Sequence, residues 1–99
     1  MADDERERRI VDVLMALQEG EVTTYGDVAE VAGYPRNARL VGRILATTDV
    51  DIPWWRVVNS AGRLVPGHER RQIRLLREED VIIRDGHVKE APVGRFSRV

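Results

Sequence analysis

The chain has 99 residues, 33% of them charged, and its 16 basic side chains nearly cancel its 17 acidic ones. This length predicts one domain over residues 1–99 with one modest hydrophobic core. The balanced net charge is no evidence of nucleic-acid binding, so only the distribution of the charges can bear on it. Because the chain has no cysteine, it can form no disulfide, thiolate nucleophile or cysteine-based zinc site, and we expect neither a metal nor a cofactor.

The sequence contains no run of about 18 apolar residues that could span a membrane. Its first segment, MADDERERR, is charged from the third position, unlike the basic and then apolar leader of a signal peptide. We therefore expect a soluble, cytoplasmic protein that does not bind membranes and is a monomer.

Apolar spacing predicts helices in the first half of the chain. The first covers residues 4–17 and stops at Gly20, with apolar residues at the helical spacings i, i+3, i+4 and i+7. The second begins at Thr24 and ends at Gly33. We expect the hydroxyl of Thr24 to cap this helix by accepting a hydrogen bond from the amide of Asp27.

A third helix is predicted over residues 37–48, with Val41, Ile44 and Leu45 facing inward at helical spacing. The short segment GYPR joins it to the second helix. Two short helices connected in this way are typical of a helix-turn-helix.

The second half of the chain predicts short strands and one further helix. Residues 56–65 contain two β-prone runs around the turn NSAG, which predicts a hairpin that would form a wing. Residues 68–80 predict a fourth helix, and residues 81–90 predict a second hairpin with Asp85-Gly86 as its turn. The predicted fold is therefore mainly α with small β, a winged helix-turn-helix-like DNA-binding domain.

Three arginines of the third helix, Arg36, Arg39 and Arg43, fall within a sector about 60° wide on a helical wheel. This sector lies roughly opposite the apolar residue Val41. Guanidinium groups grouped on one face can contact the phosphates of a nucleic-acid groove. A charged face that is merely solvated is the alternative interpretation.

Beside these arginines runs a stripe of small residues, Ala38, Gly42 and Ala46, at i, i+4 and i+8. A glycine in the middle of a helix costs on the order of 1 kcal/mol relative to alanine, so Gly42 indicates that something approaches this backbone closely. That neighbour is either DNA or another helix that packs against the small side chains.

Both tryptophans of the chain stand side by side in PWWRVV, residues 53–58. In an extended segment adjacent side chains point in opposite directions, so the two indoles cannot easily share one core. One of them is expected to line a cavity or surface, where its flat face could stack on a nucleobase. Burial of both in the core is the alternative.

The segments TTYGDVAEVAG, NARLVGRILA and PWWRVVNSAGRL resemble, in order and spacing, the C-terminal domain of O6-alkylguanine-DNA alkyltransferases. The resemblance covers roughly residues 5–80. In that family the helix-turn-helix binds the DNA minor groove, and the cysteine of a Pro-Cys-His-Arg-Val motif accepts the alkyl group. Trp54 stands at the cysteine position, as is usual in the alkyltransferase-like branch, so the resemblance places it in the wall of a pocket for a flipped base.

The replacements at this motif imply that the protein is not an enzyme. Alkyl transfer needs a thiolate and a base that generates it, and an indole cannot attack an alkyl group. Trp55 occupies the position of the family histidine, so the activating base is also missing. The resemblance therefore implies a non-enzymatic sensor that binds O6-alkylguanine in double-stranded DNA and flags it for nucleotide-excision repair proteins.

The resemblance also assigns roles to individual residues. Arg39 would intercalate where the flipped nucleotide leaves the stack, and Tyr25 would press on its phosphate. Arg56 would hold the hairpin by hydrogen bonds, and the loop at Pro66 and Gly67 would cover the base. The expected DNA- and lesion-binding residues are Thr24, Tyr25, Arg36, Ala38, Arg39, Gly42, Arg43, Pro53, Trp54, Val58, Asn59 and Ser60.

Two other classes of function remain open from the residues. A winged-helix transcription regulator would use the third helix for base contacts in the major groove and would prefer one DNA sequence. An enzyme could use a carboxylate such as Asp49 or Asp51, although both are expected in a solvated turn.

Overall fold

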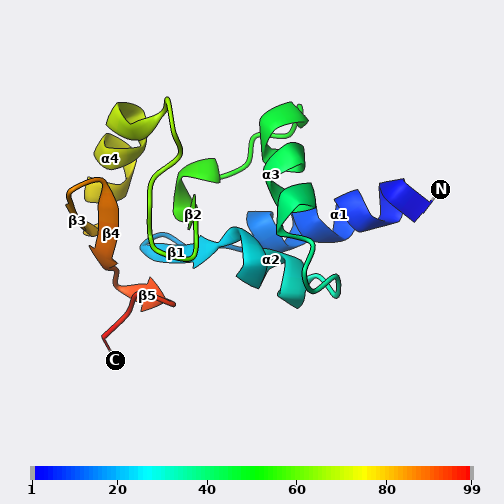
Figure 1. The fold of residues 1–99 in the computed structure, drawn as a ribbon, viewed down its shortest axis with the longest axis horizontal. Helices are drawn as coiled ribbons and strands as arrows, with labels where there is room; N and C mark the ends of the chain where they lie inside the picture. Colours follow the sequence, from blue (N-terminus) through cyan, green and yellow to red (C-terminus); the bar gives the residue numbers. More distant parts are fainter. Residues whose placement is uncertain (1, 99) are drawn as a thin grey trace.

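The computed structural model describes the main chain of residues 2–98 and the side chains from residue 5 onward. Three helices gather at one end of the molecule: α1 (Ala2–Met15), α2 (Tyr25–Val31) and α3 (Ala38–Thr47) (Figure 1). They confirm the three helices predicted in this part of the sequence. In the described part of the chain, no helix combines the length and apolar character needed to cross a bilayer.

The centre of the molecule contains a small sheet that the sequence analysis missed. Strand β1 (Glu21–Thr24) lies between β2 (Val57–Val58) and β5 (Val93–Gly94), and both neighbours run parallel to it. The segment EVTT is too short and polar to give a strand signal by itself. Its identity as a strand depends on partners that are far away in the sequence.

The other end of the molecule contains α4 (Glu69–Arg77) and a hairpin of β3 (Ile82–Arg84) and β4 (His87–Glu90) (Figure 1). Asp85 and Gly86 form the turn with positive φ angles of 53° and 72°. Positive φ at both central residues is the requirement of a type I′ turn, which Asp-Gly meets at little cost. The predicted fourth helix and second hairpin are confirmed.

The predicted wing hairpin over residues 56–65 is wrong in its pairing. The turn does form, because the Gly62 amide donates to the Asn59 carbonyl at 2.9 Å. The chain after the turn, however, pairs with the second hairpin: Arg63 bridges His87, and the Leu64 amide donates to the Gly86 carbonyl at 3.1 Å. The fold class is nevertheless confirmed as mainly helical with small sheets and a helix-turn-helix.

Two hydrophobic clusters lie on either side of the central sheet. The first joins α1, α2 and α3, and the second joins the sheet to α4 and the hairpin. Val57 belongs to the first cluster and its neighbour Val58 to the second, as alternation along a strand requires. The two-residue strand β2 thereby connects the two cores, and the segment that precedes it lies between them.

Candidate nucleic-acid interface

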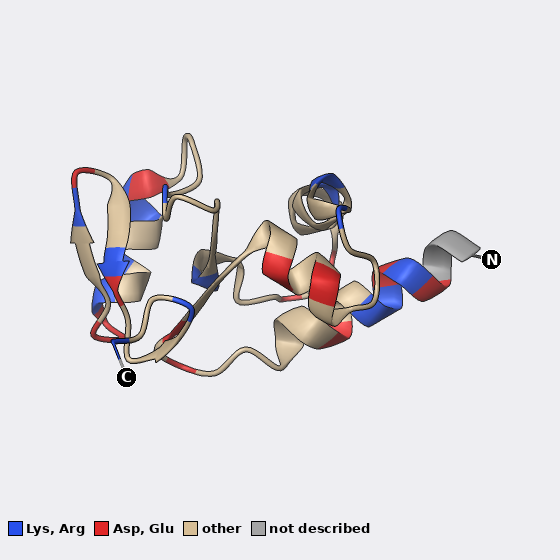
Figure 2. Cartoon of the chain, turned by 60° about the horizontal axis from the view of Figure 1, so that its bottom comes forward, with Lys and Arg blue, Asp and Glu red and all other residues tan. Residues whose placement is uncertain are grey.

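The helix-turn-helix consists of α2 and α3. The Thr24 hydroxyl accepts a hydrogen bond from the Asp27 amide at 3.1 Å, which confirms the predicted cap. Arg39 and Arg43 are exposed on α3, but Arg36 lies in the preceding turn with φ of 68°, so its predicted place on the same helix face is wrong. The two helices carry opposite charges. The charged residues of α2 are acidic, whereas those of α3 are basic (Figure 2).

A pocket of about 370 Å³ opens between α3 and the start of α4. It brings together Tyr25, Gly42 and Trp54, which the sequence analysis proposed separately as binding residues. Its full lining is Tyr25, Gly42, Leu45, Ala46, Trp54, Val65, His68 and Arg71.

The small residues of α3 form an open wall of this pocket. Among the described residues, no atom outside the local helix lies within 4 Å of the place a Cβ would occupy at Gly42. Ala46 lines the same pocket and is exposed. The alternative that another helix packs against this stripe is therefore wrong, and the open face leaves room for an external molecule.

The two tryptophan side chains point in different directions, as predicted, but the cause is a 3-10 helix and not an extended strand. Residues Trp54–Arg56 form a 3-10 helix rather than an extended segment, and successive side chains then point about 120° apart. Trp54 is half-buried in the pocket wall, whereas Trp55 packs against the second hydrophobic cluster. Their rings meet edge to face, with centroids 6.3 Å apart.

Two side chains at the start of α4 flank Trp54. The His68 ring meets it edge-on at 5.7 Å between centroids, and the Arg71 guanidinium carbon lies 5.9 Å from its centroid. Contacts of a cation with an indole face are favourable by about 0.5–2 kcal/mol. The wall of the pocket therefore contains the indole ring of Trp54 with the permanent positive charge of Arg71 beside it.

A buried carboxylate holds the segment that carries Trp54. Glu79 accepts hydrogen bonds from the Trp55 indole nitrogen at 2.8 Å, from the Gly20 amide at 2.8 Å and from Arg56 at 2.9 and 3.0 Å. Burial by itself would raise the pKa of Glu79, but the hydrogen bonds from Arg56, Gly20 and Trp55 outweigh it and lower this pKa. Arg56 also donates to the Leu17 carbonyl at 2.9 Å, so it ties the segment to Glu79 and to the turn that follows α1 rather than to the predicted wing hairpin.

Gln72 provides a second support from α4. It is fully buried, and its amide nitrogen donates to the carbonyls of Trp55 at 3.1 Å and Val57 at 3.3 Å. Its oxygen accepts from the Val65 amide at 2.8 Å. Gln72 thus fixes the loop, the 3-10 helix and α4 relative to one another, which sets the width of the pocket.

A second, more open groove of about 470 Å³ adjoins the pocket, and Tyr25 lines both hollows. It collects the predicted residues Thr24, Arg36 and Ala38 from the helix-turn-helix and Asn59 and Ser60 from the turn after β2. Asn59 and Ser60 therefore line this groove and not the pocket that contains Trp54.

Val58 and Pro53 are likewise not among the residues that line the pocket. Val58 is fully buried in the second core. Pro53 is half-buried and caps the start of the 3-10 helix. Of residues 53–58, Trp54 is the one that lines the pocket.

Burial raises the pKa of Tyr25 above its ordinary value. The hydroxyl therefore stays protonated at neutral pH and can donate a hydrogen bond. A protonated phenol between the two hollows can contact a phosphate in the groove without adding negative charge there.

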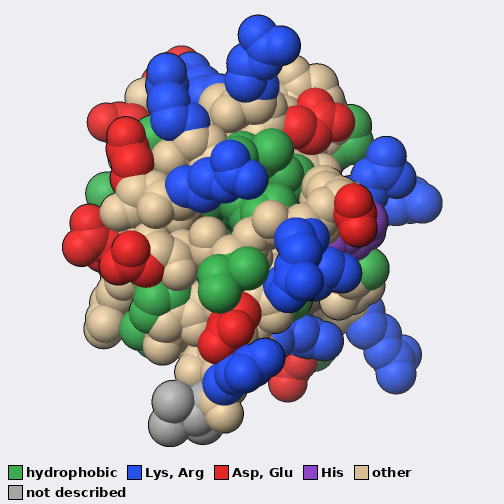
Figure 3. All heavy atoms as spheres, turned by 90° about the vertical axis from the view of Figure 1, so that its left-hand side faces the viewer, with side chains coloured by type: hydrophobic (Ala, Val, Ile, Leu, Met, Phe, Trp, Pro, Cys, Tyr) green, Lys and Arg blue, Asp and Glu red, His purple; other side chains and the backbone are tan. Residues whose placement is uncertain are grey.

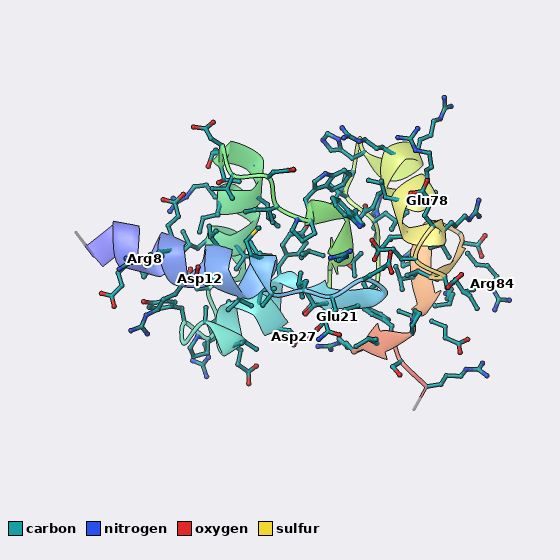
Figure 4. All side chains as sticks on the ribbon, turned by 180° about the vertical axis from the view of Figure 1, so that it is seen from behind. Arg8, Asp12, Glu21, Asp27, Glu78 and Arg84 are labelled. Carbon is teal, nitrogen blue, oxygen red and sulfur yellow. The ribbon has the colours of Figure 1, made fainter. Side chains whose placement is uncertain are left out.

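The sequence analysis missed His68, Arg71 and Arg95. His68 is the N-cap residue of α4 and Arg71 lies in its first turn, and neither was proposed as a binding residue. Arg95 lies beyond the stretch on which the resemblance rests, yet its guanidinium nitrogen pairs with both oxygens of Asp27 at 2.9 Å and lines the groove. Figure 4 shows Asp27 on the side of the molecule where β5 lies.

Comparison with known proteins agrees with this arrangement. The family model described as 6-O-methylguanine DNA methyltransferase, DNA binding domain, matches residues 5–81. A DNA base-flipping protein of Escherichia coli (strain K12) is 38% identical over 91 residues, which span 87% of this chain and 70% of that protein. Alkyltransferase-like protein 1 of Schizosaccharomyces pombe is 35% identical over 89 residues, 84% of this chain and 82% of its own.

A solved structure gives the same relationship in three dimensions. The crystal structure of S. pombe Atl1 in complex with damaged DNA containing O6-carboxymethylguanine superposes with a TM-score of 0.73 at 34% identity. The match covers 82% of this chain and 81% of that one. The chain therefore belongs to the family of the 6-O-methylguanine DNA methyltransferase DNA-binding domain, in its alkyltransferase-like branch.

Proposed function

We propose that this protein is a non-enzymatic sensor of O6-alkylguanine in double-stranded DNA, which flips the damaged nucleotide into the pocket at Trp54. The observation that carries the proposal is that Trp54 lines a pocket with an open α3 backbone on one side and the groove of the helix-turn-helix beside it. Relatives named as a DNA base-flipping protein and as Atl1 bound to damaged DNA support it.

In this scheme α3 approaches the minor groove with its small residues against the DNA. Arg39 enters the stack and fills the gap that the flipped nucleotide leaves. Tyr25, which lines both hollows, contacts the phosphate of that nucleotide as it rotates from the groove toward the pocket. Trp54 then packs against the extruded base.

The energetics favour damaged nucleotides. Extrusion of a base costs a few kcal/mol, and less where pairing is already weak. An alkyl group on O6 of guanine removes the proton used in pairing with cytosine, so the lesion flips more easily. Stacking on Trp54 returns about 1–3 kcal/mol, which is comparable with the cost of extrusion.

We further propose that the complex is long-lived and marks the lesion for nucleotide-excision repair proteins, with the protein acting as a cytoplasmic monomer. Its sequence has neither a thiolate nucleophile nor the family histidine, so the bound lesion is not repaired by transfer. A distorted duplex held by a protein is the product that such a pathway can recognise.

The central test is a binding titration with matched duplexes that differ only in one O6-methylguanine. A lesion sensor prefers the damaged duplex in every surrounding sequence. A winged-helix regulator, the alternative, instead prefers one duplex sequence and is indifferent to the lesion. Equal affinity for both duplexes in all sequence contexts would remove the support for the proposal.

Incubation with O6-methylguanine DNA is expected to leave the mass of the protein unchanged and the lesion intact. Intact-protein mass spectrometry and analysis of the DNA nucleosides measure the two. Trp54→Cys is expected to transfer little, because Trp55 occupies the position of the activating base and its nitrogen donates to Glu79. Methylation of the unmodified protein would show that another nucleophile is present.

Replacement of Arg36 or Arg43 with alanine is expected to weaken binding to damaged and undamaged DNA alike. The slope of log K against log salt should become shallower by about one unit, because each phosphate contact releases counterions. Arg84→Ala is the matched control, since Figure 4 places Arg84 at the end of the molecule away from the helix-turn-helix. An unchanged slope would place the substituted arginine away from the backbone.

Arg39→Ala provides the contrast within the same experiment. Because its proposed contact exists only after a base has left the stack, the variant should lose most of the preference for the lesion while it still binds undamaged duplex. If Arg39→Ala instead loses the same factor in affinity for damaged and undamaged duplex, Arg39 is another phosphate contact.

A further inference from the structure

The pocket at Trp54 is lined by positive charge without any negative charge among its described residues. Of its lining residues, Arg71 carries a permanent positive charge, and no carboxylate is among those that the structure describes there. The remaining lining is apolar or neutral. A substituent that enters this pocket therefore meets a cation beside an indole and no compensating acid.

Arg71 differs from the other arginines of α4. Arg70, Arg74 and Arg77 line a separate hollow on the outer face of the helix together with Ile73. Figure 3 shows basic side chains around exposed apolar atoms at this end of the molecule. Successive residues of a helix point about 100° apart, so Arg71 turns toward Trp54 while its neighbour Arg70 points away.

The charge of Arg71 is not neutralised by the nearest acid. Glu69 lies two residues away, but its oxygen accepts from the Gly67 amide at 2.8 Å, and Glu69 does not line the pocket. Glu79 is engaged with Arg56 and Trp55. The helix itself is fixed by the buried Gln72, and the exposed Arg71 side chain extends from it to within 5.9 Å of the Trp54 ring centroid.

We propose that the pocket discriminates among O6 adducts by charge, and that Arg71 makes it favour adducts that end in a carboxylate over neutral adducts of the same size. The inference rests on the proposed function, because it concerns the fit of the base once it has been flipped. A guanidinium can donate charge-assisted hydrogen bonds to a carboxylate, which are roughly twice as strong as neutral ones.

The test compares four duplexes of one sequence that differ at a single guanine. That guanine is unmodified or carries O6-methyl, O6-carboxymethyl or O6-carbamoylmethyl, the last having nearly the shape of the carboxymethyl group without its charge. The carboxymethyl duplex is expected to bind about tenfold more tightly than the carbamoylmethyl duplex, as a hydrogen bond to a charged group implies. The difference should shrink as salt rises.

Arg71→Gln should abolish this difference, so that the carboxymethyl and carbamoylmethyl duplexes bind with equal affinity. Arg70→Gln is the matched control, because it removes an equal charge one residue away on the outer face. Circular dichroism verifies that both variants are folded.

Equal affinity for the carboxymethyl and carbamoylmethyl duplexes in the unmodified protein would overturn the inference. An equal loss of affinity for all four duplexes in Arg71→Gln would also overturn it, because Arg71 would then contact the DNA backbone and not the adduct. Equal affinity for modified and unmodified guanine would instead contradict the proposed function itself, so the two failures are distinguishable.

Discussion

Replacement of Glu79 with alanine is expected to lower the free energy of unfolding by about 3–5 kcal/mol, the cost of removing one partner of a buried charge pair. The Glu79 side chain is 8% exposed and that of Arg56 14%, so loss of the carboxylate leaves a guanidinium shielded from water. It also leaves the Trp55 indole and the Gly20 amide without their acceptor. Urea unfolding followed by circular dichroism measures the change.

Two control variants separate the charge from the position. Glu78→Ala removes the adjacent, exposed carboxylate at the end of α4 and should change stability by no more than about 0.5 kcal/mol. Glu79→Gln keeps an acceptor oxygen, so its loss of unfolding free energy should lie between those of Glu78→Ala and Glu79→Ala. If Glu79→Ala is as stable as the unmodified protein, the network contributes nothing to the stability of the fold.

Stability should also depend on the charge of Glu79 in acid. Because the pKa of Glu79 is lower in the folded protein than in the unfolded chain, this group stabilises the fold above the usual carboxyl range of about 4.3. The contribution is lost as the pH falls from there through the lowered pKa. The stability difference between the unmodified protein and Glu79→Gln should accordingly narrow below about pH 4.

The second large effect is expected at Trp54. Trp54→Ala should weaken binding to O6-alkylguanine duplex by about 1–3 kcal/mol, the value of one base stacked on an aromatic side chain. Undamaged duplex should lose much less, because its bases remain in the stack. The difference follows from the position of Trp54, which is half-buried in the pocket wall rather than in either core.

The measurement is the pair of affinities on protein that circular dichroism shows to be folded. A fluorescent base analogue such as 2-aminopurine at the target position should also change its emission when the base leaves the stack. Trp55→Phe is the matched control: it removes the indole donor to Glu79 and should affect stability more than lesion preference. Equal losses on damaged and undamaged DNA in Trp54→Ala would make Trp54 structural.

Local signals in the sequence predicted the helices, the Thr24 cap and the Asp85-Gly86 turn correctly. Each depends on residues within a few positions: apolar spacing for a helix, a hydroxyl three residues before an amide for a cap, and two residues that tolerate positive φ for a turn. Position along the family motif was also enough to single out Trp54. These features need no information about distant parts of the chain.

The parallel strand β1 and the failed wing hairpin had no such signal. The sequence EVTT becomes a strand because Val57–Val58 and Val93–Gly94 pair with it from far away in the chain. The segment after the Asn59 turn has the β propensity of a hairpin strand, but it finds its partners at residues 86–88. Pairing of this kind depends on where the two cores place the strands, because propensity alone does not choose a partner.

The sequence by itself thus determined that the protein has a helix-turn-helix with small residues on α3, and it singled out Trp54 as a candidate binding residue. Only the tertiary structure decided what surrounds that tryptophan. The packing of α4 through Gln72 and Glu79 brings Arg71 and His68 to it, and the terminal segment brings Arg95 to the groove. These contacts join residues on different elements, so their positions follow from how two cores pack around a short sheet.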